Sequence, residues 1–180
     1  VAYQQDLHFK QLFKVLELMG RDWAKDMVHV AYGMVSMEDG AMSTRSGKVV
    51  LLEDVLQKAV EKARAIIEEK NPALERKDEI ARTVGTGAVI FGALVNNKIK
   101  DIVFSYDKVL NFDGETCPYV QYTAARCNSV LKKGGTYGAF TVGALTPEEY
   151  ELVSILGNFP AVVQSAGEKY EPSFVTRYAI

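Results

Sequence analysis

The chain has 180 residues, 48% of them hydrophobic, which is enough for one ordinary core or two small ones. Its net charge of -2 excludes an overall basic field that would attract nucleic acid, so any such contact must come from a local patch. Two histidines, and two cysteines without CxxC spacing, argue against a zinc site. No apolar run reaches the roughly 18 to 20 residues of a membrane span, and we expect a cytoplasmic protein.

The first predicted elements are a helix and a short strand. Apolar residues at three- and four-residue spacing predict a helix over residues 7–19, and Gly20 follows where a helix would stop. Residues 27–35 are largely apolar and form a strand candidate. A polar loop over residues 36–47 comes next.

Two further helices are predicted in the middle of the chain. Residues 55–67 are amphipathic and end before a proline. Residues 78–97 contain glycines that allow a neighbouring backbone to approach closely. These glycines resemble a dinucleotide-binding GxGxxG, but Ile90 stands at the third glycine position and no strand precedes them, so we reject that reading. A brief strand over 102–104 and a turn over 111–115 follow.

The remainder is predicted to be helical. One helix spans residues 118–133 and ends at two glycines, and residues 146–149 form a capping box with proline at the first helical position. Two more helices begin near 158–160 and 171–173. Short links between antiparallel helices favour a bundle, so the predicted class is mainly α with short β-strands.

The loop over residues 40–47 carries hydroxyls and cations between glycines, among them Ser43, Thr44 and Arg45, with Lys48 just after it. A mobile cationic loop can stabilise the charge that develops when a triphosphate is attacked at its α-phosphorus. The alternative from these residues alone is a solvated surface turn. A second polar cluster, which includes Gln5, lies at the start of the first helix, where unpaired amides can orient a ligand.

That second cluster also has a plain alternative, in which Asp6 caps the helix and a histidine packs at its boundary. A third constellation lies on the helix over 118–133. At 100° per residue, Tyr119, Tyr122, Arg126 and Lys133 share one stripe, which suits unstacked bases and phosphates. The tyrosines could instead pack against the next helix. A separate apolar face, which can be buried, contains Val120, Ala124, Cys127 and Leu131.

Read together, these segments resemble bacterial arginyl-tRNA synthetases of class I along essentially the whole chain. The matching stretches are Gln5-Asp-Leu-His8-Phe9-Lys-Gln11, Met42-Ser43-Thr44-Arg45, Val84-Gly-Thr-Gly-Ala-Val-Ile-Phe, Asn111-Phe-Asp-Gly-Glu115, Pro118-Tyr119-Val-Gln121-Tyr122-Thr-Ala-Ala-Arg126, Phe159-Pro160 and Glu171-Pro172-Ser173. The resemblance implies three segments: the end of a Rossmann-type catalytic domain (1–35), a signature-loop and connecting region (36–110), and the start of a helical anticodon-binding domain (111–180).

The resemblance also implies an activity. Arginine and ATP, with Mg²⁺, give arginyl-adenylate, and the arginyl group then passes to the 3′ end of tRNA(Arg); no membrane or DNA partner is implied. By position, Gln5 would bind arginine and the loop would close over the phosphates. The implied catalytic residues are Ser43, Thr44 and Arg45. The implied ATP-binding residues are His8, Met34, Val35, Met42, Ser43, Arg45 and Lys48. The implied tRNA-binding residues are Tyr119, Tyr122 and Arg126.

The chain departs from the family pattern in its signature loop, where Ala41 replaces a usual lysine and Ser46 replaces a frequent second cation. It also carries no His-Ile-Gly-His signature. Because the sequence does not begin with Met and stops in mid-pattern, we expect a fragment that does not form the adenylate alone. The alternatives are a non-catalytic tRNA-binding module and a helical scaffold without a ligand.

Overall fold

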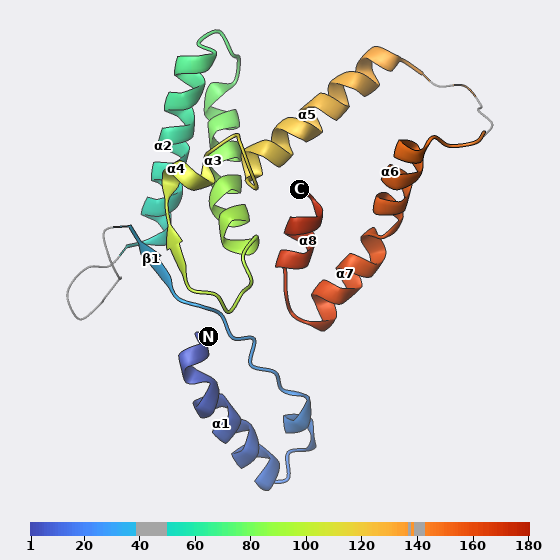
Figure 1. Cartoon of the computed structure of the whole chain (residues 1–180). Helices are drawn as coiled ribbons and strands as arrows, with labels where there is room; N and C mark the ends of the chain where they lie inside the picture. The colour runs from blue at the N-terminus through green and yellow to red at the C-terminus, as the bar shows by residue number, and fades with distance from the viewer. Residues whose placement is uncertain (39–49, 137, 139–142) are drawn as a thin grey trace. The chain divides into compact units, whose positions relative to one another are not determined.

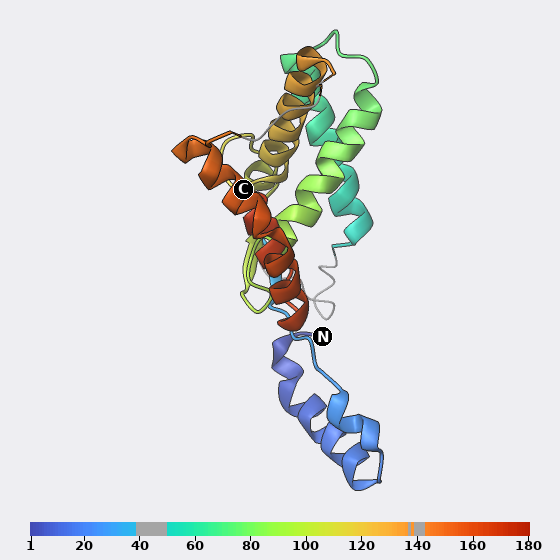
Figure 2. The ribbon, with the colours of Figure 1, turned by 90° about the vertical axis from the view of Figure 1, so that its right-hand side faces the viewer.

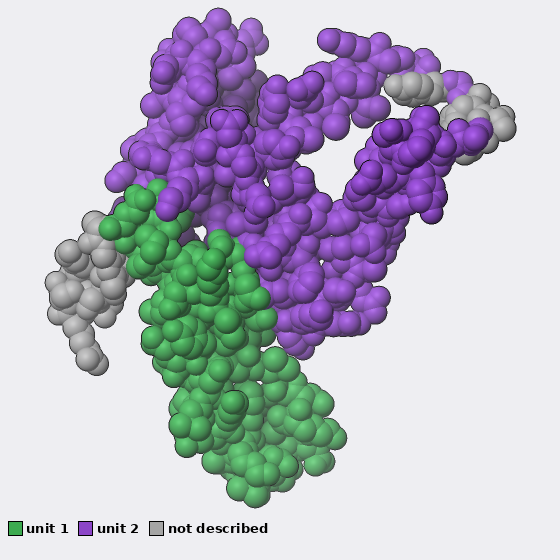
Figure 3. Space-filling view, in the orientation of Figure 1, with its two compact units in different colours: residues 1–49, 96–105 green, residues 50–95, 106–180 purple. Residues whose placement is uncertain are grey.

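The computed structural model describes residues 1–38, 50–136, 138 and 143–180 (Figure 1). The chain divides into two compact units, which Figure 3 distinguishes by colour. Unit 1 consists of Val1–Val49 and Asn96–Ser105, and unit 2 consists of Val50–Val95 and Tyr106–Ile180. The described residues are mainly helical with two short strands, as predicted. The division into three functional segments remains a prediction.

Unit 1 contains one long helix and a two-stranded parallel sheet. Its elements are the 3-10 helices η1 (Tyr3–Gln5) and η2 (Asp22–Asp26), the helix α1 (Asp6–Leu18), and the strands β1 (Val35–Met37) and β2 (Ile102–Phe104). The helix predicted over residues 7–19 is confirmed, and Gly20 follows it with a φ of 75°, which glycine adopts without strain. Strand β2 has the bounds that the sequence predicts.

The strand predicted over residues 27–35 is wrong in its placement. Only Val35 belongs to β1, and the segment before it makes a single isolated bridge, from Tyr32 to Ala2. A strand needs a partner along its length, and β2 pairs only with Val35–Met37. An apolar run therefore indicated a strand in this part of the chain but could not show where its partner begins.

Unit 2 is helical. Its elements are α2 (Leu52–Lys70), α3 (Lys77–Leu94), α4 (Tyr106–Val109), α5 (Cys117–Gly134), α6 (Pro147–Gly157), α7 (Phe159–Glu168) and α8 (Ser173–Tyr178). The sequence predicted each of these helices except α4, which is a single turn and too short to show a period. The capping box at Thr146 is present, because its side chain and that of Glu149 each accept a backbone N–H from the other residue.

The core of unit 2 lies between α2 and α3, which form an antiparallel hairpin in both ribbon views (Figures 1 and 2). Small side chains allow the two helices to approach closely; the buried cluster is Ala63, Ala81, Ala88 and Leu110. An added Cβ at Gly85 would lie 2.7 Å from the Val60 Cα atom, so only glycine fits there. The close approach predicted from the glycines is confirmed.

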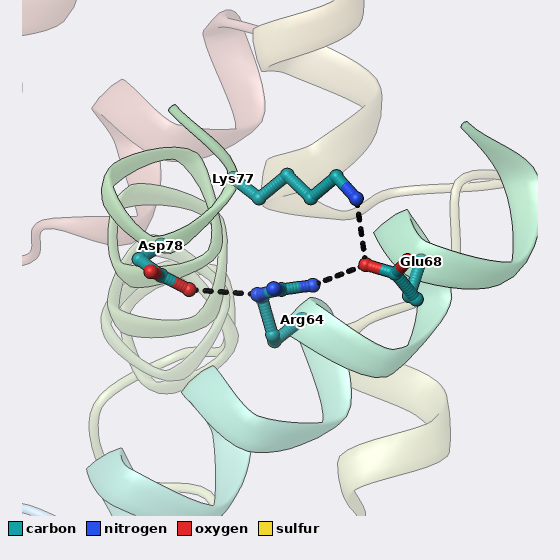
Figure 4. Close-up of polar contacts among 4 residues, drawn as sticks. All are labelled: Arg64, Glu68, Lys77 and Asp78. Carbon is teal, nitrogen blue, oxygen red and sulfur yellow. Dashed lines mark hydrogen bonds and ion pairs between the residues drawn. The ribbon is translucent and has the colours of Figure 1, made fainter. Parts of the chain in front are cut away.

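Four charged side chains join the two helices near the turn of this hairpin (Figure 4). Arg64 donates to Asp78 at 2.7 Å and to Glu68 at 2.6 Å, and Lys77 donates to Glu68 at 2.8 Å. The hydrogen bond from Lys77, followed by that from Arg64, lowers the pKa of the Glu68 carboxyl. The network thus pairs α2 with the first turn of α3.

The last helix, α8, contacts the C-terminal end of α3. The Thr176 hydroxyl donates to the Leu94 carbonyl and the Arg177 Nε to the Val95 carbonyl, both at 3.0 Å. The carbonyls of the last residue of α3 and of its C-cap residue are therefore satisfied. Helices α5 and α6 are mostly exposed along their length. None of the helices in the described part of the chain is both long and apolar enough to cross a membrane.

Candidate functional site

The first predicted polar cluster lies where η1 leads into α1. Gln5 is the residue before α1 and makes no side-chain cap. The side chains of Gln5 and His8 are exposed and make no hydrogen bond to any residue that the structure describes, although the His8 ring lies edge-on to Phe9 at 5.5 Å. Both groups are therefore accessible in unit 1.

Asp6 does not cap α1, so the capping alternative is wrong. Its carboxylate points to His29, with Oδ1 2.8 Å from Nδ1, a short contact that is not aligned as a hydrogen bond. The other ring nitrogen, Nε2, donates to the Val1 carbonyl at 3.0 Å, and the ring stacks on Phe9 at 4.2 Å. His29 thus ties the start of the chain to α1. No periodic pattern in the sequence indicates this role for His29.

The backbone at Met34 and Val35 is held by the segment that precedes β2. The Asp101 carboxylate accepts the Met34 N–H at 2.6 Å, and the Ile102 N–H donates to the Met34 carbonyl at 2.9 Å. A Cβ at Gly33 would collide with the Lys100 carbonyl, so this approach requires glycine. The side chains of Met34 and Val35 remain exposed. Sequence reasoning missed Asp101, whose only signal was its place just before a strand.

The predicted phosphate loop lies outside the described residues. This applies to all the loop positions that the sequence singles out: Met42, Ser43, Thr44, Arg45 and Lys48. Their predicted roles rest on sequence alone.

The predicted stripe on α5 is exposed. Tyr119 and Tyr122 keep 40% and 54% of their surface accessible, so they are not packed against the next helix in the described structure. The Arg126 guanidinium lies 5.8 Å from the centre of the Tyr122 ring, as the helical spacing predicts, and Lys133 is also exposed. The aromatic and cationic groups of the stripe therefore face solvent together.

The apolar face of α5 is covered only near its start. Pro118 is fully buried and Val120 is half-buried, whereas Cys127 and Leu131, farther along the same helix, are exposed. The predicted face exists, but the described residues do not bury its second half.

A compact turn leads into α5. The Thr116 hydroxyl donates to the Asn111 carbonyl at 2.5 Å and accepts the Tyr119 N–H at 3.4 Å, so it caps the helix. The Asn111 side chain accepts the Asp113 N–H at 3.0 Å, and Gly114 has a φ of 106°. The turn predicted over residues 111–115 is confirmed.

Helix α5 meets α3 at a glycine. A Cβ at Gly87 would lie 2.9 Å from the Cys117 Sγ and 3.0 Å from the Gln121 Nε2. Gln121 also donates through Nε2 to the Thr83 carbonyl at 3.4 Å. Burial raises the pKa of the Cys117 thiol, so this group packs as a neutral side chain.

A hollow of about 420 Å³ lies beside α2, α4 and the following loop. Lys62 and Lys70 line it, but so do Glu69, Asp107 and Asp113, and Lys62 is paired with Asp107 at 2.8 Å. Because its three carboxylates outnumber its two lysines, this hollow is a poor anion site. Within the described ranges, no three His, Cys, Asp or Glu side chains gather as a metal site.

Two family models match the chain. The model for "tRNA synthetases class I (R), catalytic domain" matches residues 1–106, and that for the "DALR anticodon binding domain" matches residues 120–180. The first match includes Gln5, His8, Met34 and Val35. The second match contains most of α5.

Curated relatives and a solved structure point the same way. An arginine–tRNA ligase from Halothermothrix orenii is 53% identical over 99% of this chain and 32% of its own length. One from Clostridium beijerinckii is 53% identical over 100% of this chain and 32% of its own length. The arginyl-tRNA synthetase of Thermus thermophilus matches with a TM-score of 0.83 and 38% identity over 93% of this chain and 28% of that one. The chain spans about a third of the length of the curated relatives.

Proposed function

The chain belongs to the class I arginyl-tRNA synthetase family, and we propose that it works as part of an arginine–tRNA ligase. The family membership confirms the resemblance that the motifs indicated. The proposed reaction joins L-arginine to ATP as arginyl-adenylate and then transfers the arginyl group to the 3′ end of tRNA(Arg). We place this activity in the cytoplasm, without a membrane or DNA partner.

We propose that the stripe on α5 binds tRNA. The observation that carries this proposal is the joint exposure of Tyr119, Tyr122 and Arg126 in and next to the segment that matches an anticodon-binding domain. An exposed aromatic face stacks on an unpaired base, and a cation beside it attracts the adjoining phosphate. Because the whole chain has a net charge of -2, a local patch of this kind is what a tRNA contact requires.

We propose that unit 1 contributes to the substrate pocket. The exposed Gln5 amide would bind arginine and His8 would lie near the nucleotide. Met34 and Val35 would run beside the adenine, supported by the hydrogen bond from the Met34 N–H to the Asp101 carboxylate. A backbone fixed in this way presents its side chains to a ligand with little loss of entropy on binding.

The signature loop would act on the phosphates of ATP. Ser43 and Thr44 supply hydroxyls and Arg45 supplies a permanent cation, which together would stabilise the charge that develops on pyrophosphate. Ala41 carries no charge, so it cannot neutralise phosphate. The cations in and just after the loop are Arg45 and Lys48. We propose that Mg²⁺ accompanies ATP as part of the substrate, bound through the phosphates.

We further propose that the 180-residue chain binds tRNA but does not form the adenylate alone, since it carries no His-Ile-Gly-His signature. The test measures two activities of the purified chain. We expect salt-dependent binding of a tRNA(Arg) transcript and no arginine-dependent exchange between ATP and pyrophosphate. Arginylation of tRNA by this chain would contradict the second part.

The tRNA proposal is tested with the Tyr119→Ala/Tyr122→Ala variant. Loss of two base stacks, each worth roughly 1 to 3 kcal/mol, should weaken tRNA binding by at least about tenfold. The matched control is Tyr150→Ala on α6, because Tyr150 is 67% exposed but lies off the stripe. Equal affinities for the double variant and the control would exclude α5 as the binding surface.

A further inference from the structure

Helix α3 lies between two sets of neighbours and meets each of them at a glycine. Gly85 faces the α2 backbone, whereas Gly87 faces Cys117 and Gln121 of α5. Residues two positions apart on an ideal helix are rotated by about 200° from each other, so these glycines lie on opposite sides of α3. The side that faces α2 belongs to the core, and the side that faces α5 holds the base of the helix that carries the stripe.

We infer that Gly87 is a positioning residue for the tRNA-binding stripe of α5. The inference rests on the proposed function, because it concerns how that same surface is oriented. Gly87 itself is not proposed to contact tRNA. It acts by letting the first turn of α5 lie directly on α3.

The contact at Gly87 has little space to adapt. A Cβ there would approach the Cys117 Sγ to 2.9 Å, and this sulfur is only one bond from the Cys117 Cβ, so it cannot move away as the end of a long side chain can. The Gln121 side chain is packed as well. Its Nε2 donates to the Thr83 carbonyl, and its Oε1 is buried without a partner among the described residues.

A shift at this contact is amplified along α5. At about 1.5 Å per residue, Arg126 lies roughly 13 Å beyond Cys117 along the helix axis. Most of α5 beyond its first turns is exposed, so the residues that the structure describes provide no packing there that would correct a tilt. A small rotation at Cys117 therefore moves Tyr122 and Arg126 relative to the rest of unit 2.

The test compares three variants of the full 180-residue chain in binding to the tRNA(Arg) transcript. Gly87→Ala should weaken binding by at least about fivefold, the equivalent of one lost base stack. Gly167→Ala is the matched control, because Gly167 lies in helix α7 with nothing within 4 Å of an added Cβ. Its affinity should equal that of the unaltered chain.

The third variant, Gly87→Ala/Cys117→Ala, removes the sulfur that the new methyl group would meet. It should recover most of the affinity lost in Gly87→Ala, because only the 3.0 Å contact with the Gln121 Nε2, at the end of a longer side chain, remains. A general loss of stability at position 87 would not explain this recovery. Unchanged binding by Gly87→Ala would overturn the inference. So would a double variant that binds as weakly as Gly87→Ala.

The Tyr119→Ala/Tyr122→Ala variant separates this inference from the proposed function. If that variant binds tRNA normally, the stripe is not the binding surface and both proposals fail. If it loses binding while Gly87→Ala keeps it, the stripe binds tRNA and only the positioning role is wrong. The circular dichroism spectrum of each variant shows whether its helices have formed.

Discussion

The α2–α3 hairpin and α5 are built from helices of similar length but differ in how they use their side chains. The hairpin buries alanines against each other, requires glycine at position 85, and joins its helices through Arg64 and three other charged residues. Helix α5 buries Pro118 at its start and then exposes both Tyr122 and Leu131. The helices of the hairpin pack against each other, whereas α5 exposes groups that a partner can contact.

This difference shows how one chain can combine stability with recognition. A binding helix must keep aromatic and cationic groups exposed, which gives up the hydrophobic burial that would otherwise stabilise it. Its geometry must then come from a few contacts at one end. Here these contacts are the Thr116 cap and the junction of Gly87 with Cys117 and Gln121.

The largest effect is expected for Gly85→Ala, in the hairpin. The new methyl group would lie 2.7 Å from backbone atoms of Val60, which cannot rotate away, so α2 and α3 must separate. We expect the free energy of unfolding to fall by about 2 kcal/mol, as measured by urea denaturation followed by circular dichroism. Gly167→Ala, whose methyl group meets nothing, should not lower it. Equal stability of the two variants would show that the hairpin is loosely packed.

A smaller effect is expected for Arg126→Ala. Removing this exposed cation beside Tyr122 should weaken tRNA binding roughly threefold and reduce the slope of log affinity against log salt by about 1, since one phosphate contact is lost. The control is Lys132→Ala, which removes the same charge from another side of α5. A salt slope that changes equally in both variants would mean that the position on the helix is irrelevant.

The smallest effect concerns the charge network of the hairpin. Hydrogen bonds from Lys77 and Arg64 lower the pKa of Glu68 in the folded chain below its ordinary value of 4.5. The stability from this pairing is therefore fully present above pH 4.5 and is lost as the pH falls through the lowered folded-state pKa.

In Glu68→Gln, the midpoint of thermal unfolding should fall less as the pH drops below 4.5. Its tRNA binding at neutral pH should not change. Because the pair is exposed, high salt should reduce the difference between the variant and the unaltered chain. A variant with the same acid profile as the unaltered chain would show that this network does not contribute.

Several local features of the fold were predicted correctly from the sequence. The Thr146 capping box, the stop at Gly20 and the spacing of Tyr122 and Arg126 each depend on residues a few positions apart, and the structure contains all three. Such features follow from helix geometry and capping preferences without knowledge of distant partners.

The contacts that the sequence could not predict join residues far apart in the chain. His29 meets Asp6, and Asp101 binds the Met34 N–H across 67 positions. No local pattern shows which of many carboxylates will find a given partner. For the same reason, the strand predicted over residues 27–35 was misplaced. The exposure of Leu131 was also beyond prediction, because an apolar face indicates only that burial is possible.

The most direct measurement is ultraviolet crosslinking of the bound tRNA(Arg) transcript to the chain, with the linked tyrosines mapped by mass spectrometry. Tyr119, Tyr122 and Tyr150 are all exposed, so accessibility alone would label each of them. We predict crosslinks at Tyr119 or Tyr122 and none at Tyr150. Crosslinks confined to Tyr150, or to Tyr106 beside the hairpin, would contradict the assignment of recognition to α5.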